Sequence, residues 1–355
     1  MSVGTFYKTF ANSDRTTTKT LLHESIPVTG TLAKGTYISS AQTDGISREQ
    51  NIKTFSHAMF QSVYDYPHLS SSANHIFDIT AGFSSASSVS SSAHTHVNVL
   101  ESKKINIYNQ MAQALVGYDT NNNIRRFDLD GNLEAGDKHD EVVFINFSRL
   151  LVKDEIKRGS FSLQLGGNSN DATPFNGNQI VTITDADAAT NVKVNSPAGE
   201  YGLLKSGSTN VGLIYYQAGI AVLATGSFTD GASTSDMTAS GSLVHSLASS
   251  SINQIADAVR NRIYNVSFNN TTELNSSVYF CRASHNEFNY SSNPTYLSNS
   301  KIVVKDDDIT TPPRSYITTV GLYSADNELL AVAKLSEPLK KTPDNEVTLR
   351  VRLDY

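Results

Sequence analysis

The end of the chain alternates strictly between apolar and polar residues. Val347, Leu349, Val351, Leu353 and Tyr355 stand at every second position, and a charged or hydroxyl residue separates each pair. Successive side chains of a strand point to opposite faces, so this period of two predicts a strand with one buried and one wet face. The pattern therefore favours an antiparallel sheet at the C-terminal end.

Other segments carry similar strand signals. VGLIYY and IAVLAT, separated by Gln217-Ala218-Gly219, predict a buried hairpin, although so apolar a run is also compatible with a helical part. YITTVGLY and ELLAVAKL, separated by SADN, predict a second hairpin. Single strands are expected at HIFDITAGF (75–83), EVVFINFSRLLV (141–152), FSLQLG (161–166), QIVTIT (179–184), SSVYFCRA (276–283) and KIVVK (301–305).

Three segments place apolar residues at spacings of three and four, which predicts helices. They are residues 44–66, with Ile52, Phe55, Met59 and Val63 on one face; residues 103–119; and residues 249–266. Pro67 follows the first of them as a stop signal.

These elements together predict an α+β fold. The C-terminal half is expected to be β-rich, built of an antiparallel sheet and hairpins, with a few amphipathic helices packed on it. We divide the chain into a mixed N-terminal region at 1–160, a loop- and hairpin-rich, insertion-like region at 161–245, and a region at 246–355. The last region is expected to complete one core with the first.

Composition excludes several classes of function. The net charge is -6 and the sequence pI is about 5.8, so no electrostatic attraction to nucleic acid or to an anionic membrane is expected. The longest apolar run, at 211–224, is too short for a membrane span. The N-terminal residues lack a secretory signal, and a single cysteine favours synthesis in a reducing compartment.

The single cysteine raises the question of a thiol active site. Cys281 is followed by His285 and Glu287, and a cysteine needs a nearby histidine or a helix N-terminus to become a nucleophile. Alternation within SSVYFCRA instead makes Cys281 an ordinary strand residue. We therefore favour a packed cysteine.

Two other groups resemble metal sites. His94 and His96 form a His-x-His pair, but no third ligand stands at a recognisable spacing, which leaves only a site shared between subunits open. Residues 128–141 carry Asp128, Asp130, Asn132, Glu134 and Asp137, yet position twelve of a calcium loop would be His139, so an Asp-Gly turn explains them better. Asp306–Asp308 are expected in a solvated loop.

Local signatures of hydrolases, nucleotide-binding proteins and zinc proteases are absent from the sequence. We assign no catalytic, cofactor-binding or metal-binding residue, and no cofactor is expected.

Several segments resemble a family of virion structural proteins. FYKTFANSDRTTTKTLLHESIPVTGTL, FQSVYDYPHLSSSANHIFDITAGFSSAS, KKINIYNQMAQALVGYD, FINFSRLLVKDEIKRGSFSLQLG, HNEFNYSSNPTY and YITTVGLYSADNELLAVAKLSEPLKK are similar to proteins of contractile-tailed, T4-like marine bacteriophages of the cyanophage type. The resemblance implies a tail or baseplate component that is assembled in the host cytoplasm. Its partners would be copies of itself, as a homo-oligomer, and neighbouring tail proteins.

The stretch HNEFNYSSNPTY is then expected to hold a connection in place. Its Asn and Ser side chains can bond nearby backbone, and Phe288, Tyr290 and Tyr296 are candidate interface anchors. Two other functions stay open. One is a receptor- or glycan-binding module at the tail tip, and the other is a virion-associated hydrolase that uses Glu287, Asp128 or His139 as acid or base.

Overall fold

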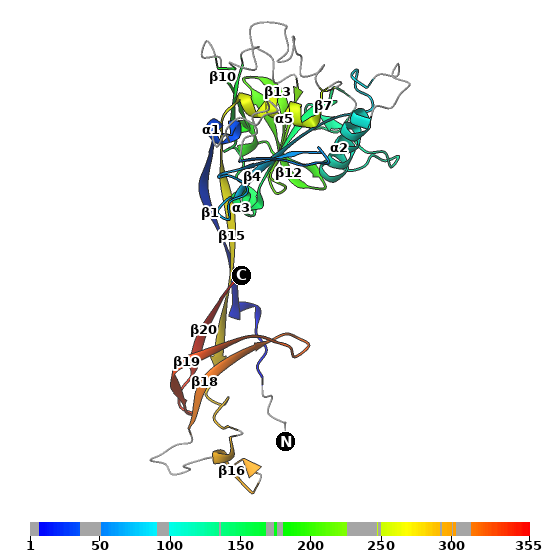
Figure 1. Ribbon diagram of the computed structural model, residues 1–355. Coiled ribbons are helices and arrows are strands. Elements are labelled where there is room, and N and C mark those ends of the chain that lie inside the picture. Colours follow the sequence, from blue (N-terminus) through cyan, green and yellow to red (C-terminus); the bar gives the residue numbers. More distant parts are fainter. Residues whose placement is uncertain are drawn as a thin grey trace. The chain divides into compact units, whose positions relative to one another are not determined.

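The computed structural model describes residues 7–35, 51–90, 99–134, 136–167, 174–175, 180–225, 247, 250–291, 293–299, 301–302 and 314–355. The chain divides into two compact units (Figure 1). One comprises Met1–Leu21 with Glu273–Tyr355, and the other comprises Leu22–Thr272. β1 and β15 each contribute residues to both units.

The described part of the chain is rich in strands and holds few helices, as the sequence predicts. The helices are α1 Gly30–Lys34, α2 Val99–Leu115, α3 Arg149–Val152 and α5 Ile252–Arg262, with 3-10 turns η1 Asn12–Asp14, η3 Ala186–Ala189 and η5 Pro294–Tyr296. The strands of the first half are β1 Arg15–Thr29, β2 Ile52–Thr54, β3 Gln61–Tyr64, β4 His75–Phe83, β5 Phe127–Asp128, β6 Lys138–His139, β7 Glu141–Phe147, β8 Glu155–Ile156 and β9 Ser162–Gly166. Those of the second half are β10 Ile180–Thr184, β11 Lys193–Ser196, β12 Gly199–Ser206, β13 Thr209–Tyr215, β14 Ile220–Ala224, β15 Ile263–Ala283, β16 Leu297–Ser298, β17 Lys301–Ile302, β18 Ser315–Tyr323, β19 Leu329–Lys341 and β20 Val347–Asp354.

The unit formed by Leu22–Thr272 is built on one antiparallel sheet. From β15 the strand order is β9, β10, β12, β13, β14, β7, β4, β3 and β2, and every neighbouring pair in this order is antiparallel. The predicted hairpin at 211–224 is confirmed, because Leu213 pairs with Val222 across β13 and β14. Strands β9, β10, β12, β13 and β14, from the segment expected to be insertion-like, lie in the middle of this sheet. The division into three regions stays a prediction.

The helices α2 and α5 cover this sheet and are set by local sequence signals. Both predicted helices are confirmed, although the second ends at Arg262 and gives way to β15. Ser251 caps α5 by accepting from the Gln254 backbone, and the Gln254 side chain accepts from the Ser251 backbone in return. Gly82 of β4 lets α2 approach closely, because a Cβ there would lie 2.7 Å from the Lys104 carbonyl oxygen.

In the other unit, β20 pairs with the C-terminal part of β15 and β18 pairs with β19. The predicted hairpin at 316–335 is therefore confirmed, and β19 continues to Lys341. The predicted alternation of β20 is also found. Val351 is buried and Arg350 and Arg352 are exposed, while Tyr355, at the end of the expected buried face, is 70% exposed.

The helix predicted for residues 44–66 is wrong. Its second half forms β2 and β3, in which Ile52 pairs with Val63. Both of these side chains enter the core, whereas Met59 lies exposed in the connection, next to Ala58 with φ 48. A spacing of three and four over a short run also suits a hairpin whose ends face the same core. Residues 44–50 lie outside the described residues.

The strand predicted for residues 141–152 is correct only up to Phe147. There the chain turns into α3, and Val152 packs under Gly219, where a Cβ would lie 2.8 Å from the valine side chain. The expected strand KIVVK is described only at its first two residues, in β17. In the part of the chain that the structure describes, none of the helices has the length and apolar character needed to cross a membrane.

Candidate interaction surface

The stretch from His285 to Asn289 is organised around a buried lysine. Lys341, at the end of β19, is 0% exposed. Its ammonium group donates to the His285 carbonyl oxygen (3.2 Å), the Asn289 side-chain oxygen (2.8 Å) and the Thr342 carbonyl oxygen (2.9 Å). Burial lowers the pKa of Lys341. The stretch therefore has a clear structural role as a connection between β15 and the β18–β19 hairpin.

The three candidate anchors of this stretch have different surroundings. Phe288 and Tyr290 are 40% and 41% exposed, so both present apolar area to the outside. Tyr296 is half-buried, and its hydroxyl donates to the Arg314 carbonyl oxygen at 3.1 Å. Their role as interface anchors stays a prediction, and the first two suit it better.

Cys281, His285 and Glu287, considered above as a thiol site, do not act on one another. His285 pairs with Glu346 at 3.1 Å, and Glu287 pairs with Lys8 at 2.7 Å. Cys281 is half-buried, and burial raises the pKa of its thiol. A raised thiol pKa disfavours the reactive thiolate.

Asp128 and His139 lie on the small β5–β6 ribbon and are both buried, at 3% and 6% exposed. Burial alone would raise the pKa of Asp128, but hydrogen bonds from Lys138 and from the Leu133 backbone outweigh it, so the pKa is lowered. Burial lowers the pKa of His139 to about 4, and its Nε2 has no hydrogen-bond partner among the described residues. A general acid or base must reach the substrate, which neither buried group can do in this conformation.

No group of three His, Cys, Asp or Glu side chains among the described residues could hold a metal ion. The pair His94 and His96 lies outside the described residues, and so does the run Asp306–Asp308.

The β18–β19 hairpin leaves much apolar surface uncovered. It forms a two-stranded sheet of its own, and such a hairpin is marginally stable in water unless something packs on it. One face is partly covered, because Leu322 is buried and its cross-strand partner Ala331 is half-buried. Large apolar side chains that stay exposed on the hairpin are Tyr316, Tyr323, Leu329, Leu330, Val332 and Leu339.

Four of these residues gather near the turn and form what we call the hairpin patch: Tyr323, Leu329, Leu330 and Val332. Gly321 pairs with Val332, and a Cβ on this glycine would lie 2.9 Å from the Tyr323 ring and 3.5 Å from the Leu329 side chain. Leu330 is the extra residue of a β-bulge and is 66% exposed. Contiguous exposed apolar residues of this kind are typical of protein-protein interfaces.

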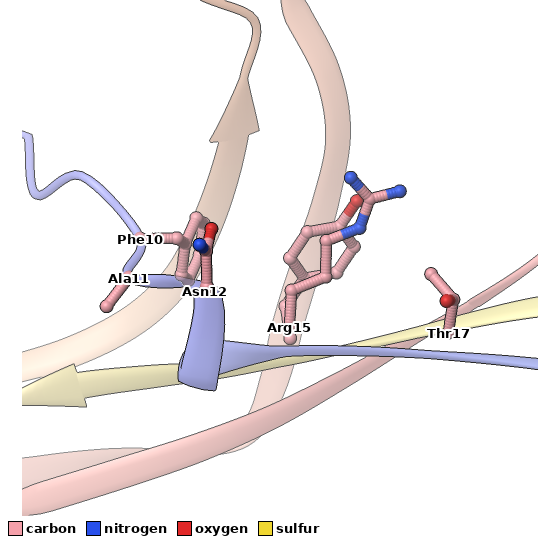
Figure 2. A pocket seen from close by; sticks show the side chains of 6 residues that line it. Phe10, Ala11, Asn12, Arg15 and Thr17 are labelled. Carbon is pink, nitrogen blue, oxygen red and sulfur yellow. The ribbon is translucent and has the colours of Figure 1, made fainter.

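A second surface feature is an open hollow at residues 8–17, which we call the N-terminal arm (Figure 2). It has a volume of about 650 Å³ and is lined by Phe10, Ala11, Asn12, Arg15, Thr17 and Tyr279. The Phe10 and Tyr279 rings lie 5.4 Å apart, and the Arg15 guanidinium lies 5.8 Å from the centre of the Tyr279 ring. Sequence reasoning missed this hollow, because no spacing links Tyr279 to an arm more than 260 residues away in the chain.

Comparison with known proteins gives no relative. No family model matches the chain, and neither the curated proteins nor the solved structures contain a significant match.

The role of Lys341 leads to a stability prediction. We expect Lys341→Met to lower the free energy of unfolding by about 2 kcal/mol, because the carbonyl oxygens of His285 and Thr342 and the side-chain oxygen of Asn289 lose their donor. Urea denaturation followed by circular dichroism measures the change. Lys340→Met, at the exposed neighbouring position, is the control and should change it by less than about 0.5 kcal/mol. Equal effects of the two substitutions would contradict the assigned role.

Proposed function

We propose that the chain is a non-enzymatic structural subunit of a bacteriophage virion, in the contractile tail or baseplate. It acts through protein-protein interfaces with copies of itself and with neighbouring tail proteins. The observation that carries the assembly part of the proposal is the hairpin patch, an exposed apolar surface on a hairpin that forms a two-stranded sheet of its own. The virion part rests on the sequence resemblance to structural proteins of contractile-tailed phages.

Several properties of the molecule support this proposal. The surface carries few charges, since charged residues make up 17% of the chain. Tyrosine and leucine dominate the hairpin patch. Protein-protein interfaces are enriched in aromatic residues and have few charged residues at their centre. No other described strand pairs with β18 or β19, so their outer edges offer backbone donors and acceptors with which a strand of another protein can pair.

Self-association tests the assembly part. We expect the wild-type chain to sediment at a multiple of 38.5 kDa. The double substitution Leu330→Lys with Val332→Lys should raise the dissociation constant at least tenfold, because it places two charges where apolar side chains become buried. Analytical ultracentrifugation over a range of concentrations measures both results.

The matched control places the same two charges elsewhere. Leu69→Lys with Leu150→Lys changes residues that are 91% and 60% exposed but lie outside the hairpin, and it should leave the dissociation constant unchanged. A wild-type chain that stays monomeric at every concentration would count against the proposal. Mass spectrometry of purified phage particles tests the virion part, which fails if the chain is absent from them.

A second candidate function is a receptor- or glycan-binding module. The hollow in Figure 2 favours it, because it joins two aromatic rings with polar side chains at an open surface. In this case the chain would contact the host surface from the tail tip.

A further inference from the structure

The hollow at the N-terminal arm presents an arginine that is available to a charged ligand. Among the described residues, no carboxylate forms an ion pair with the Arg15 guanidinium. The neighbouring Asp14 is already engaged, since its side chain forms an ion pair with Arg282 at 3.3 Å and accepts a hydrogen bond from the Ala11 backbone at 3.1 Å. The guanidinium stacks on Tyr279 and leaves its planar set of N–H donors for a ligand.

The arm that carries one wall of the hollow is held in place. Lys8 pairs with Glu287 at 2.7 Å, Asp14 pairs with Arg282, and the Phe10 ring packs on Tyr279. These contacts hold the arm along the segment that leads into Arg15. They fix the arm before any ligand arrives, which lowers the ordering cost of binding.

We infer that this hollow binds an acidic sugar residue, such as a uronic or sialic acid, of a surface polysaccharide. The inference rests on the second candidate function. The C–H face of a sugar ring suits the negative face of an aromatic ring, which the exposed Phe10 provides. A planar carboxylate matches the two parallel N–H groups of Arg15. The Asn12 amide and the Thr17 hydroxyl can bond the sugar hydroxyl groups (Figure 2).

The charge pattern argues for a single carboxylate rather than a polyphosphate. Only one guanidinium lines the hollow, and no lysine is among its lining residues. Sites for phosphate chains rely on clusters of cations or on the N-terminus of a full helix. The lining residues offer one cation and only the start of the three-residue 3-10 turn η1. A volume of about 650 Å³ also accommodates one or two sugar rings.

The test uses two ligands that differ only at C6, which is a carboxylate in one and a hydroxymethyl group in the other. Methyl β-glucuronide and methyl β-glucoside share a ring, and only the first carries a carboxylate. We expect saturation-transfer NMR and titration with the full chain at low salt to show at least tenfold tighter binding of the glucuronide. Arg15→Met should abolish this preference, whereas Arg350→Met, at an exposed arginine of β20, should retain it. Tyr279→Ala should weaken the binding of both sugars.

The possible outcomes separate the inference from the proposed functions. Equal binding of both sugars would overturn the acidic specificity but support the second candidate function. If neither the glucuronide nor the methyl glycoside of N-acetylneuraminate binds, or if Arg15→Met keeps the preference, the assigned site is wrong. Circular dichroism confirms that each variant is folded. Ultracentrifugation of the same samples reports self-association independently, so loss of sugar binding cannot be confused with loss of assembly.

Discussion

Phe147→Ala should lower the free energy of unfolding by about 4 kcal/mol, twice the effect expected of Lys341→Met. Phe147 lies in β7, is 3% exposed, and its ring centroid is 5.1 Å from that of Phe268, 5.9 Å from Phe161 and 6.1 Å from Phe77. Three neighbouring rings from separate segments of the chain cannot all collapse into the space left behind. The lost burial is therefore joined by the cost of a cavity.

Two further variants calibrate the loss of stability expected for Phe147→Ala. Phe147→Leu keeps most of the volume and should cost about 1.5 kcal/mol. Tyr66→Ala removes an aromatic ring that is 47% exposed, and it should cost less than about 0.5 kcal/mol. Urea denaturation followed by circular dichroism measures all three. An effect of Phe147→Ala no greater than that of Tyr66→Ala would show that the four rings do not form a packed core.

The sequence predicts best where a local pattern and the tertiary packing agree. The hairpin of β13 and β14 is correctly predicted because its runs are apolar on both sides and are separated by a Gly-containing turn, which fixes strand pairing locally. The helix α5 carries both a capping box and an apolar face. In each case, several independent signals favour the same element.

The sequence fails where a short pattern fits two structures. Ile52 and Val63 stand eleven residues apart, which is three turns of a helix but equally the two ends of a tight hairpin. Sheet pairing with β4 decides for the hairpin, because it places Val63 opposite Phe77 in the core. The strand signal of β4 lies at residues 75–83, outside this segment, so residues 44–66 alone do not reveal the pairing.

The surface features depend on contacts that are distant in the chain. The β18–β19 hairpin is predictable, but the face that remains uncovered is not, because alternation alone does not say which face another element will cover. The adjacent pair Leu329 and Leu330 is a usable signal, since two neighbouring strand residues cannot both point into one core. The pairing of Arg15 with Tyr279 has no sequence signature at all.

The proposed assembly and the proposed sugar binding would place different demands on this chain and involve different residues of the same unit. The hairpin patch is apolar, so its burial against another protein is favourable because apolar surface is removed from water. The hollow is open, polar and aromatic, which suits a ligand that keeps much of its hydration. Substitutions in one feature should therefore leave the other intact, which makes the two proposals separately testable.

Lowering the pH from 6.5 to 4 should reduce the free energy of unfolding by about 3 kcal/mol because of the buried His139. Burial lowers the pKa of His139 to about 4 in the folded chain, from 6.5 in the unfolded chain. Between these values the unfolded state binds a proton that the folded state does not, so unfolding becomes easier as the pH falls. Each unit of pKa difference corresponds to about 1.4 kcal/mol, which gives the expected size.

His139→Gln isolates this contribution, because glutamine does not titrate. Urea denaturation at pH 7.5 and at pH 4.5 measures how far the free energy of unfolding falls between these pH values. This fall should be about 2 to 3 kcal/mol smaller in the variant than in the wild type. His285→Gln removes a histidine whose side chain is 64% exposed and should leave the wild-type pH dependence nearly unchanged. If His139→Gln and wild type lose the same stability over this range, His139 does not remain neutral inside the fold. Its Nε2 would then be in contact with water in solution, and a role in proton transfer would again be open for this residue.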